Sequence, residues 1–355
     1  MNNDRIQEIL DLMEEARLDY FLISDPQSIA YCTGYYNDPH ERMFVFMISK
    51  HGNHTLFMND LFYLDHDLDV NIVWHKVGQD AIQTIVDEMH FPGRIGIDKN
   101  WASHFLLDLM KKLPDAKYIN ASPCVDLVRM KKDLQEQVLM IESSKINDAV
   151  MEEIIPFIQE GVTEKQLAKK LDELFFNHHS TCYGAIVAFG KNAADPHHEN
   201  DDTLLRKGDC VLIDMGCVYK GYCSDMTRTF FYEGILEEEI KVYEIVKKAN
   251  EAAEAMIKPG VKLSDIDKCA RKVISDEGYG KYFTHRLGHF IGRDVHEYGD
   301  VSSVNEMEVE EGMIFSIEPG IYLEGNFGVR VEDLVMVTKD GCQVLNSFTK
   351  DIYII

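Results

Sequence analysis

The sequence predicts a two-domain α/β protein. Its 355 residues exceed the size at which a single hydrophobic core usually stops growing. In the first third, short apolar strand patterns alternate with helical patterns, which is typical of an α/β domain. After the basic stretch 129–132 the pattern changes to long helices that run to about Asn177. We therefore expect an N-terminal α/β domain over residues 1–128 and a second domain, also of helices and strands, over residues 129–355.

The elements of the first domain are predicted by their apolar spacing. Residues 6, 9, 10 and 13 place apolar side chains on one face of a helix. The apolar run 20–23 reads as a strand that ends in a turn at Ser24-Asp25-Pro26. Further strand patterns lie at 44–48, 55–58, 72–77 and 94–97, and helical patterns lie near 79–89 and 102–112. No G-x-G-x-x-G or Walker sequence occurs here, so nothing supports a nucleotide-binding role.

The second domain contains a short internal similarity. Segments 158–162 and 257–261 share the pattern Ile-x-x-Gly-Val, 99 residues apart, and helical patterns precede and follow each of them. This spacing predicts two related halves that form one sheet with a cleft between them. The alternative is that two such short segments agree by chance.

Charge and cysteine content limit the possible partners. The chain has 36 Lys and Arg against 61 Asp and Glu, and its net charge of -25 should repel nucleic-acid phosphates and anionic lipid. No apolar run approaches the roughly 18 residues of a membrane span, and the N-terminus lacks a signal-peptide pattern. Eight cysteines occur without a C-x-x-C pair, mostly inside apolar runs. We expect reduced thiols and a cytoplasmic location, with no nucleic-acid or membrane partner.

A first predicted hairpin contains two aspartates. Asp214 lies in the apolar strand pattern 211–215, and Asp225 lies in the strand that follows the turn 219–221. Pairing centred on that turn places the two carboxylates opposite each other. Like charges that face each other in an apolar strand pair are strongly unfavourable unless a cation lies between them. The pattern therefore indicates a cation site.

A second predicted hairpin repeats the arrangement with glutamates. Glu318 and Glu332 flank a glycine-rich turn, and pairing centred on Gly325 places them opposite each other. The alternation of side chains along a strand puts Arg330 on the same face as Glu332. We expect this arginine to lie in the same cleft as the carboxylates.

Histidines lie before and between the hairpins. His285 and His289 have the i, i+4 spacing of a metal pair, but no glutamate occupies the zincin position and Gly288 disfavours a helix there. His296 follows seven residues after His289, and His197 precedes the first hairpin. For any one of these side chains a packing or ion-pair role is the more common one, so the prediction rests on their combination.

The combination resembles the pita-bread metallopeptidases, which include methionine aminopeptidase, aminopeptidase P and prolidase. The residues that carry the resemblance are, in order, Asp214, Asp225, His289, Glu318 and Glu332. The surrounding segments that match the family in order and spacing are Pro196-His197-His198, Asp225-Met226-Thr227-Arg228-Thr229, Gly288-His289-Phe290-Ile291-Gly292, His296-Glu297, Glu318-Pro319-Gly320 and Val329-Arg330-Val331-Glu332-Asp333. Residues 1 to about 128 resemble the creatinase-type N-terminal domain of prolidases and aminopeptidase P. The chain differs from many prolidases at His197-His198, where they have His-Gly.

The resemblance implies a pita-bread α+β catalytic domain that acts as a two-metal hydrolase on Xaa-Pro dipeptides. It implies that Asp214, Asp225, His289, Glu318 and Glu332 hold two divalent ions, with a bridging hydroxide as the nucleophile. A set dominated by carboxylates favours Mn²⁺ or Co²⁺, with Zn²⁺ also possible. Four catalytic roles are expected: Glu318 as the proton acceptor, His296 at the oxyanion, His197 at the scissile amide, and Arg330 at the substrate carboxylate.

The loop 35–42 resembles the prolidase loop that reaches toward a neighbouring subunit. This similarity predicts a homodimer in which His40 and Arg42 contribute to substrate binding. An ordinary surface turn is the alternative for this loop. The alternative functions are aminopeptidase P activity on longer Xaa-Pro peptides, a creatinase-like or lyase reaction, and an inactive binding protein on the same fold.

Overall fold

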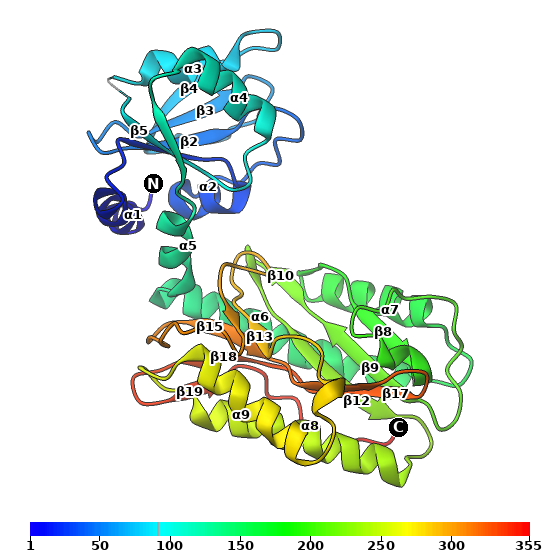
Figure 1. Ribbon diagram of the computed structural model, residues 1–355. Helices are drawn as coiled ribbons and strands as arrows, with labels where there is room; N and C mark the ends of the chain where they lie inside the picture. Colours follow the sequence, from blue (N-terminus) through cyan, green and yellow to red (C-terminus); the bar gives the residue numbers. More distant parts are fainter. Residues whose placement is uncertain (91) are drawn as a thin grey trace. The chain divides into compact units, whose positions relative to one another are not determined.

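The computed structural model describes residues 1–90 and 92–355, which form two compact units, Met1–Arg129 and Met130–Ile355. The first unit is built on a mixed six-stranded sheet, coloured blue to cyan in Figure 1, with the strand order β4-β3-β2-β1-β5-β6. Strand β1 pairs antiparallel with β2 and parallel with β5. The strands are β1 (Tyr20–Ile23), β2 (Val45–Ser49), β3 (Thr55–Asn59), β4 (Asn71–His75), β5 (Arg94–Ile97) and β6 (Lys117–Asn120).

Helices pack on this sheet, and α1 does so with the apolar face that the sequence predicts. In α1 the buried residues are Ile6, Ile9 and Met13, which join the apolar core on one side of the strands. The helices are α1 (Asn3–Glu15), α2 (Pro26–Thr33), α3 (Ala81–Glu88), α4 (Ser103–Lys112) and α5 (Pro123–Met130). The α/β architecture expected for this part of the chain is confirmed.

The turn expected at Ser24-Asp25-Pro26 is the start of helix α2. The Asp25 carboxylate accepts a hydrogen bond from Ser28 N at 2.8 Å, and Pro26 occupies the first helical position. An Asp-Pro pair suits a helix N-terminus for two reasons. The aspartate accepts a hydrogen bond from a backbone N–H of the first turn. Proline has no N–H, and an N–H at the first helical position would have no partner within the helix. The same dipeptide is common in turns, and this double use explains why the helix was not predicted.

The second unit combines long helices with short strands. Its α-helices are α6 (Leu134–Ile154), α7 (Glu164–Asn177), α8 (Glu237–Met256) and α9 (Leu263–Asp276). Its strands are β7 (Thr181–Cys182), β8 (Ile186–Phe189), β9 (Cys210–Met215), β10 (Cys217–Tyr219), β11 (Tyr222–Cys223), β12 (Met226–Phe231), β13 (Gly288–His289), β14 (Asp300–Val301), β15 (Ile314–Ile317), β16 (Gly320–Leu323), β17 (Phe327–Arg330), β18 (Asp333–Val337) and β19 (Cys342–Val344). None of the helices in the described ranges has the length and hydropathy of a bilayer-spanning segment.

The internal similarity corresponds to two matching helix pairs. Helices α7 and α9 both have 14 residues, and they begin at 164 and 263, which are 99 residues apart. Gly161 and Gly260 precede them with φ of 81° and 85°. Helix α6 packs on α7 and α8 packs on α9, the latter pair lying side by side below the strands in Figure 1. Equal lengths and equal turns favour a structural repeat over chance.

The two halves do not share one continuous sheet, contrary to the expectation. Among the described residues the strands of this unit form five small sheets, including β12-β9-β8, β15-β18-β19 and β16-β17. The ladder is interrupted at 318–319 and 331–332, where backbone leaves the strand conformation. These interruptions coincide with two of the predicted ligand positions.

Candidate metal centre

A pocket of about 730 Å³ in the second unit brings most of the predicted site residues together. Strands β8, β9, β13 and β17, the ends of other strands and the loops between them contribute to its walls. Its lining residues are Tyr183, Gly184, Ile186, Pro196, His197, Asp214, Asp225, His285, Arg286, His289, Val295, His296, Glu318, Arg330 and Glu332.

The first hairpin has a different register from the predicted one. Asp214 of β9 pairs with Thr227 of β12, so Asp225 does not face it directly. The cause is the turn, whose two central residues are Lys220 and Gly221, with φ of 48° and 82°. A two-residue hairpin turn of this kind needs positive φ at both central positions, which places the glycine second and moves the register. Asp225 lies just before β12 and still reaches the pocket.

The second hairpin has the predicted register. Ile317 pairs with Asp333 on one side of the break, and Gly320 pairs with Arg330 on the other. The same register therefore continues through the break and places Glu318 opposite Glu332. Across from them, the Thr227 hydroxyl donates a hydrogen bond to Glu332 Oε2 at 2.6 Å, which joins the two hairpins.

His289 lies against the carboxylates with its ring orientation fixed. Its Nδ1 is 3.2 Å from the Phe290 carbonyl oxygen, a contact that assigns the proton to Nδ1. The free Nε2 is 3.5 Å from Asp225 Oδ2 and 3.8 Å from Glu318 Oε1. Asp225, His289 and Glu332 each offer a ligand atom within 4.8 Å of the other two. This is the arrangement of a metal-binding histidine oriented by a backbone acceptor.

Close backbone approach positions β13. A Cβ atom on Gly288 would lie 1.9 Å from the Ser316 carbonyl oxygen, so only glycine permits this contact with β15. The Ser316 hydroxyl accepts a hydrogen bond from His289 N at 3.0 Å and lies 3.4 Å from Glu318 Oε1. Ser316 therefore couples the histidine to the glutamate.

The carboxylates raise one another's pKa in the absence of a cation. Loss of solvent raises the pKa of Asp214 to about 6, and the nearby Arg330 only partly opposes this. Loss of solvent, with the charges of Asp214 and Asp225, raises the pKa of Glu318 to about 7. Burial and three neighbouring carboxylates raise the pKa of Glu332 well above its usual value. A divalent cation bound between these carboxyl groups would stabilise their ionised forms. The donor set therefore fits a metal site.

Arg330 lies in the pocket, as expected, but its guanidinium already has four partners. Its Nη2 donates to Asp214 Oδ2 at 2.6 Å and its Nε donates to Thr227 Oγ1 at 3.0 Å. Its Nη1 donates to the Tyr322 hydroxyl at 3.0 Å and to the Pro196 carbonyl oxygen at 3.3 Å. The arginine is 2% exposed. These bonds hold Asp214 in place and leave no nitrogen without a partner.

Three histidines line the pocket beside the carboxylates. His197 and His296 are both exposed toward solvent, and the His296 ring centroid lies 4.2 Å from that of His289. Partial burial lowers the pKa of His296 to about 4, so its ring is neutral at neutral pH. His285 Nε2 is 2.8 Å from the Tyr322 hydroxyl, which in turn accepts from Arg330.

His40 and Arg42 belong to the first unit and do not line this pocket. His40 is exposed and has φ of 50°, and Arg42 forms an ion pair with its neighbour Glu41 at 2.9 Å. The contact expected between this loop and a neighbouring subunit stays a prediction.

Four pocket or pocket-wall residues were not identified from the sequence. Tyr183 and Arg286 line the pocket, and Tyr183 donates to the Ser224 carbonyl oxygen at 2.7 Å. Thr227 and Tyr322 form hydrogen bonds to the lining residues Glu332 and Arg330. Thr227 had a signal, because it lies two residues after Asp225 in the predicted strand, where alternation places both side chains on one face. The other three are brought to the pocket by tertiary packing and carry no local pattern.

Comparisons with known proteins cover nearly the whole chain. Residues 138–339 match metallopeptidase family M24, and residues 5–131 match the creatinase/prolidase N-terminal domain. An uncharacterized peptidase of Staphylococcus aureus is 35% identical over 356 residues, covering 98% of this chain and 99% of that protein. The crystal structure of a dipeptidase from Pyrococcus horikoshii has a TM-score of 0.92 and 34% identity, covering 99% of this chain and 100% of that one. A prolidase from Thermococcus sibiricus has a TM-score of 0.92 and 31% identity, covering 100% and 99%.

Proposed function

This chain belongs to metallopeptidase family M24, and on that premise we propose that it hydrolyses Xaa-Pro dipeptides. The observation that carries the proposal is the pocket in which four carboxylates and the Nε2 of His289 converge. The solved structures with which the chain shares its fold over its full length include a dipeptidase and a prolidase. The two family matches, to metallopeptidase family M24 and to the creatinase/prolidase N-terminal domain, also support this proposal.

Five residues would hold two divalent ions in this pocket. Asp214 and Asp225 would bind one ion, and Asp225, His289, Glu318 and Glu332 would bind the other, with Asp225 or the glutamates shared. Mostly oxygen donors favour Mn²⁺ or Co²⁺, and Zn²⁺ is the third choice. When bound, such ions supply Lewis-acid polarisation of the scissile carbonyl and an activated water.

Glu318 is suited to accept the proton of the attacking water and pass it to the leaving nitrogen. Its carboxylate lines the pocket, with Oε1 3.8 Å from His289 Nε2, close to where an activated water would lie. The neutral His296 keeps an N–H with which to stabilise the developing oxyanion. His197, at the pocket wall, would contact the scissile amide.

The substrate carboxylate is assigned differently from the sequence-based expectation. Four of the five N–H groups of Arg330 already donate to protein atoms, and its side chain is 2% exposed. Arg286 also lines the pocket, and in the described part of the chain its side chain has no ion pair or hydrogen bond. We therefore assign Arg286 to the carboxylate and Arg330 to the orientation of Asp214.

A peptide panel tests the proposed substrate. With Mn²⁺ or Co²⁺ present, Xaa-Pro dipeptides are expected to give higher kcat/KM than Xaa-Pro-Xaa tripeptides or Met-Xaa peptides. A dipeptide places its C-terminal carboxylate beside the Arg286 guanidinium, whereas a tripeptide places a neutral amide there. Equal or better hydrolysis of tripeptides would assign the chain to aminopeptidase P activity and leave the metallopeptidase assignment unchanged.

The assembly and location remain proposals as well. We propose a homodimer in which the loop 35–42 supplies His40 and Arg42 to the neighbouring subunit, and a cytoplasmic location suited to the eight free cysteines. Sedimentation velocity of the metal-loaded protein tests the dimer, and a species of monomer mass at all concentrations would refute it.

A further inference from the structure

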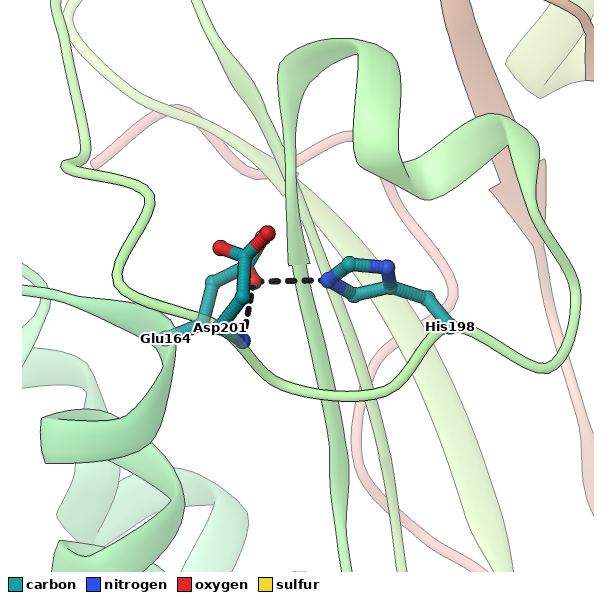
Figure 2. A group of neighbouring side chains, drawn as sticks. All are labelled: Glu164, His198 and Asp201. Atoms are coloured by element: carbon teal, nitrogen blue, oxygen red, sulfur yellow. Dashed lines mark hydrogen bonds and ion pairs between the residues drawn. The ribbon is translucent and has the colours of Figure 1, made fainter.

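The segment that carries His197 is attached to the N-terminus of helix α7 by one buried glutamate. Glu164, the first residue of α7, lies beneath residues 189–203 and has a side chain that is 0% exposed. Figure 2 shows His198 and Asp201 approaching it from the neighbouring loop. His198 is the residue that stands where many prolidases have glycine.

Four donors occupy the two oxygens of this carboxylate. Oε1 accepts from Phe189 N and from Asn192 Nδ2, each at 2.9 Å. Oε2 accepts from His198 Nε2 at 2.6 Å and from Asp201 N at 3.0 Å. Asn192 donates in addition to Thr203 Oγ1 at 3.1 Å. A buried carboxylate that is saturated by N–H donors fixes its partners, because releasing any donor leaves a polar atom unpaired.

The three side chains of Figure 2 could in principle hold a metal ion, since each offers a ligand atom. The hydrogen bonds argue against it. A cation would need the Glu164 oxygens and His198 Nε2 as free lone pairs, whereas four N–H groups already point at those oxygens. The cluster therefore functions as a hydrogen-bonded brace.

The hydrogen-bonded cluster around Glu164, called the brace below, is one residue away from the pocket, because His198 follows His197 in the chain. His197 and Pro196 line the pocket, and the Pro196 carbonyl oxygen accepts from Arg330 Nη1 at 3.3 Å. The loop is thus held on one side by Glu164 through His198 and on the other by Arg330. Because His197 itself is exposed, its direction depends on how these two neighbours are fixed.

We propose that the hydrogen bond between Glu164 and His198 positions His197 for catalysis, so that His198 is a positioning residue for peptide hydrolysis. The kinetic part of this inference rests on the proposed function. Loss of the bond lets the loop move, and a displacement of about 1 Å at a catalytic group can lower the rate on the order of a hundredfold.

Three single variants separate positioning from folding. His198→Ala removes the donor and is expected to lower kcat about tenfold or more with a small change in KM. His198→Gln keeps an N–H donor and should recover most of the activity. His178→Ala is the matched control, because it removes a histidine bond to Glu153 of 2.9 Å at the opposite end of the same helix α7, and it should leave kcat unchanged. Glu164 is not substituted, because its loss would strand four buried donors.

A double variant tests whether His198 acts through His197. In the His197→Ala background, His198→Ala should cause little further loss, since the residue that it positions is gone. Losses that multiply as independent effects would contradict the proposal, as would a His198→Ala enzyme that matches the His178→Ala control.

Amide hydrogen exchange provides a readout that does not depend on the substrate. Residues 190–203 should exchange faster in His198→Ala, return to the wild-type rate in His198→Gln, and remain unchanged in His178→Ala. Unchanged exchange in His198→Ala would overturn the brace. If the wild-type protein hydrolyses no Xaa-Pro peptide, the proposed function fails, and the exchange result alone decides whether this loop is braced.

Discussion

At the residue scale, Asp225 and His296 separate metal binding from catalysis. Asp225 is 5% exposed and lies 3.5 Å from His289 Nε2, whereas His296 contacts the histidine ring edge and faces solvent. We expect Asp225→Asn to abolish turnover and also lower the bound metal. His296→Ala should lower kcat on the order of a hundredfold or more while the metal content stays nearly unchanged.

Elemental analysis of both purified variants beside their kcat values makes this comparison. Equal loss of metal in both would show that His296 is a ligand. Full metal retention in Asp225→Asn would remove Asp225 from the ligand set.

Arg286 provides a second prediction at this scale. Arg286→Ala should lower kcat/KM for an Xaa-Pro dipeptide by tens of fold, because truncating a cation that faces a partly desolvated carboxylate costs about 2 to 5 kcal/mol. The matched control is the same dipeptide with its carboxylate converted to an amide, for which wild type and variant should be similar. An equal loss on both substrates would assign Arg286 to structure.

The sequence could predict the residues of the site because each belongs to a local motif. Asp214, Asp225, His289, Glu318 and Glu332 stand in recognisable segments, and the structure gathers them in one pocket. It could not predict that four of the five N–H groups of Arg330 donate to protein atoms, because three of these partners lie more than 100 residues away in the chain. Such partnerships follow only from tertiary packing.

At the element scale, Arg228 joins three parts of the second unit. Its side chain is 1% exposed and donates to Asp333 Oδ1 at 2.8 Å, to the Glu332 carbonyl oxygen at 2.7 Å and to the Phe348 carbonyl oxygen at 2.8 Å. Strand β12 is thereby attached to β18 and to the C-terminal segment.

Arg228→Ala is expected to lower the free energy of unfolding by about 3 kcal/mol, because buried Asp333 and two buried carbonyl oxygens lose a donor while Asp333 keeps only Lys350 Nζ at 2.8 Å. The Lys247–Asp351 pair supplies the control, since Asp351 is 80% exposed and a surface pair contributes little. Urea unfolding midpoints of Arg228→Ala and Lys247→Ala, at unchanged m value, give the comparison. Equal midpoints would contradict the role given to Arg228.

Hairpin registers show where sequence reasoning succeeds and fails at this scale. The Glu318 and Glu332 register was predicted correctly, because the turn around Gly325 is symmetric about its centre. The predicted pairing of Asp214 with Asp225 was wrong, because the two central residues of the turn are Lys220 and Gly221 and Asp214 pairs with Thr227. Lys220 adopts a positive φ that lysine seldom takes. Five of the six strands of the first unit were predicted because their apolar runs are short and bounded by turns, whereas β6 (Lys117–Asn120) was not predicted.

At the scale of the whole molecule, stability should depend on pH and metal together. Without a cation, the folded protein keeps Asp214 protonated up to about pH 6 and Glu318 up to about pH 7. The unfolded chain releases these protons near pH 4, so the folded state holds more protons in between, and its stability falls as pH rises through this window. A divalent ion removes this loss by favouring the anions.

Thermal unfolding with and without Mn²⁺ measures this linkage. The increase in Tm caused by the metal should be larger near about pH 8 than near about pH 5. A metal-induced increase that is the same at both pH values would contradict the assignment of these carboxylates to the metal site.

The repeat of helix pairs in the second unit was predicted from the sequence, whereas its division into small sheets was not. A spacing of 99 residues between two short motifs was enough to predict paired halves, which α7 and α9 now match in length. The division into several small sheets was not predictable, because strand breaks at the ligand positions leave no signal in an apolar pattern.

Metal removal tests the central claim, that this chain is a metal-dependent Xaa-Pro dipeptidase, most directly. The protein is stripped with a chelator, its residual metal is measured, and hydrolysis of an Xaa-Pro dipeptide is followed before and after Mn²⁺ or Co²⁺ is added. Clustered carboxylates cannot activate water by themselves, so we expect no turnover in the stripped protein and recovery on metal addition. Undiminished hydrolysis at a metal content near zero would contradict the account.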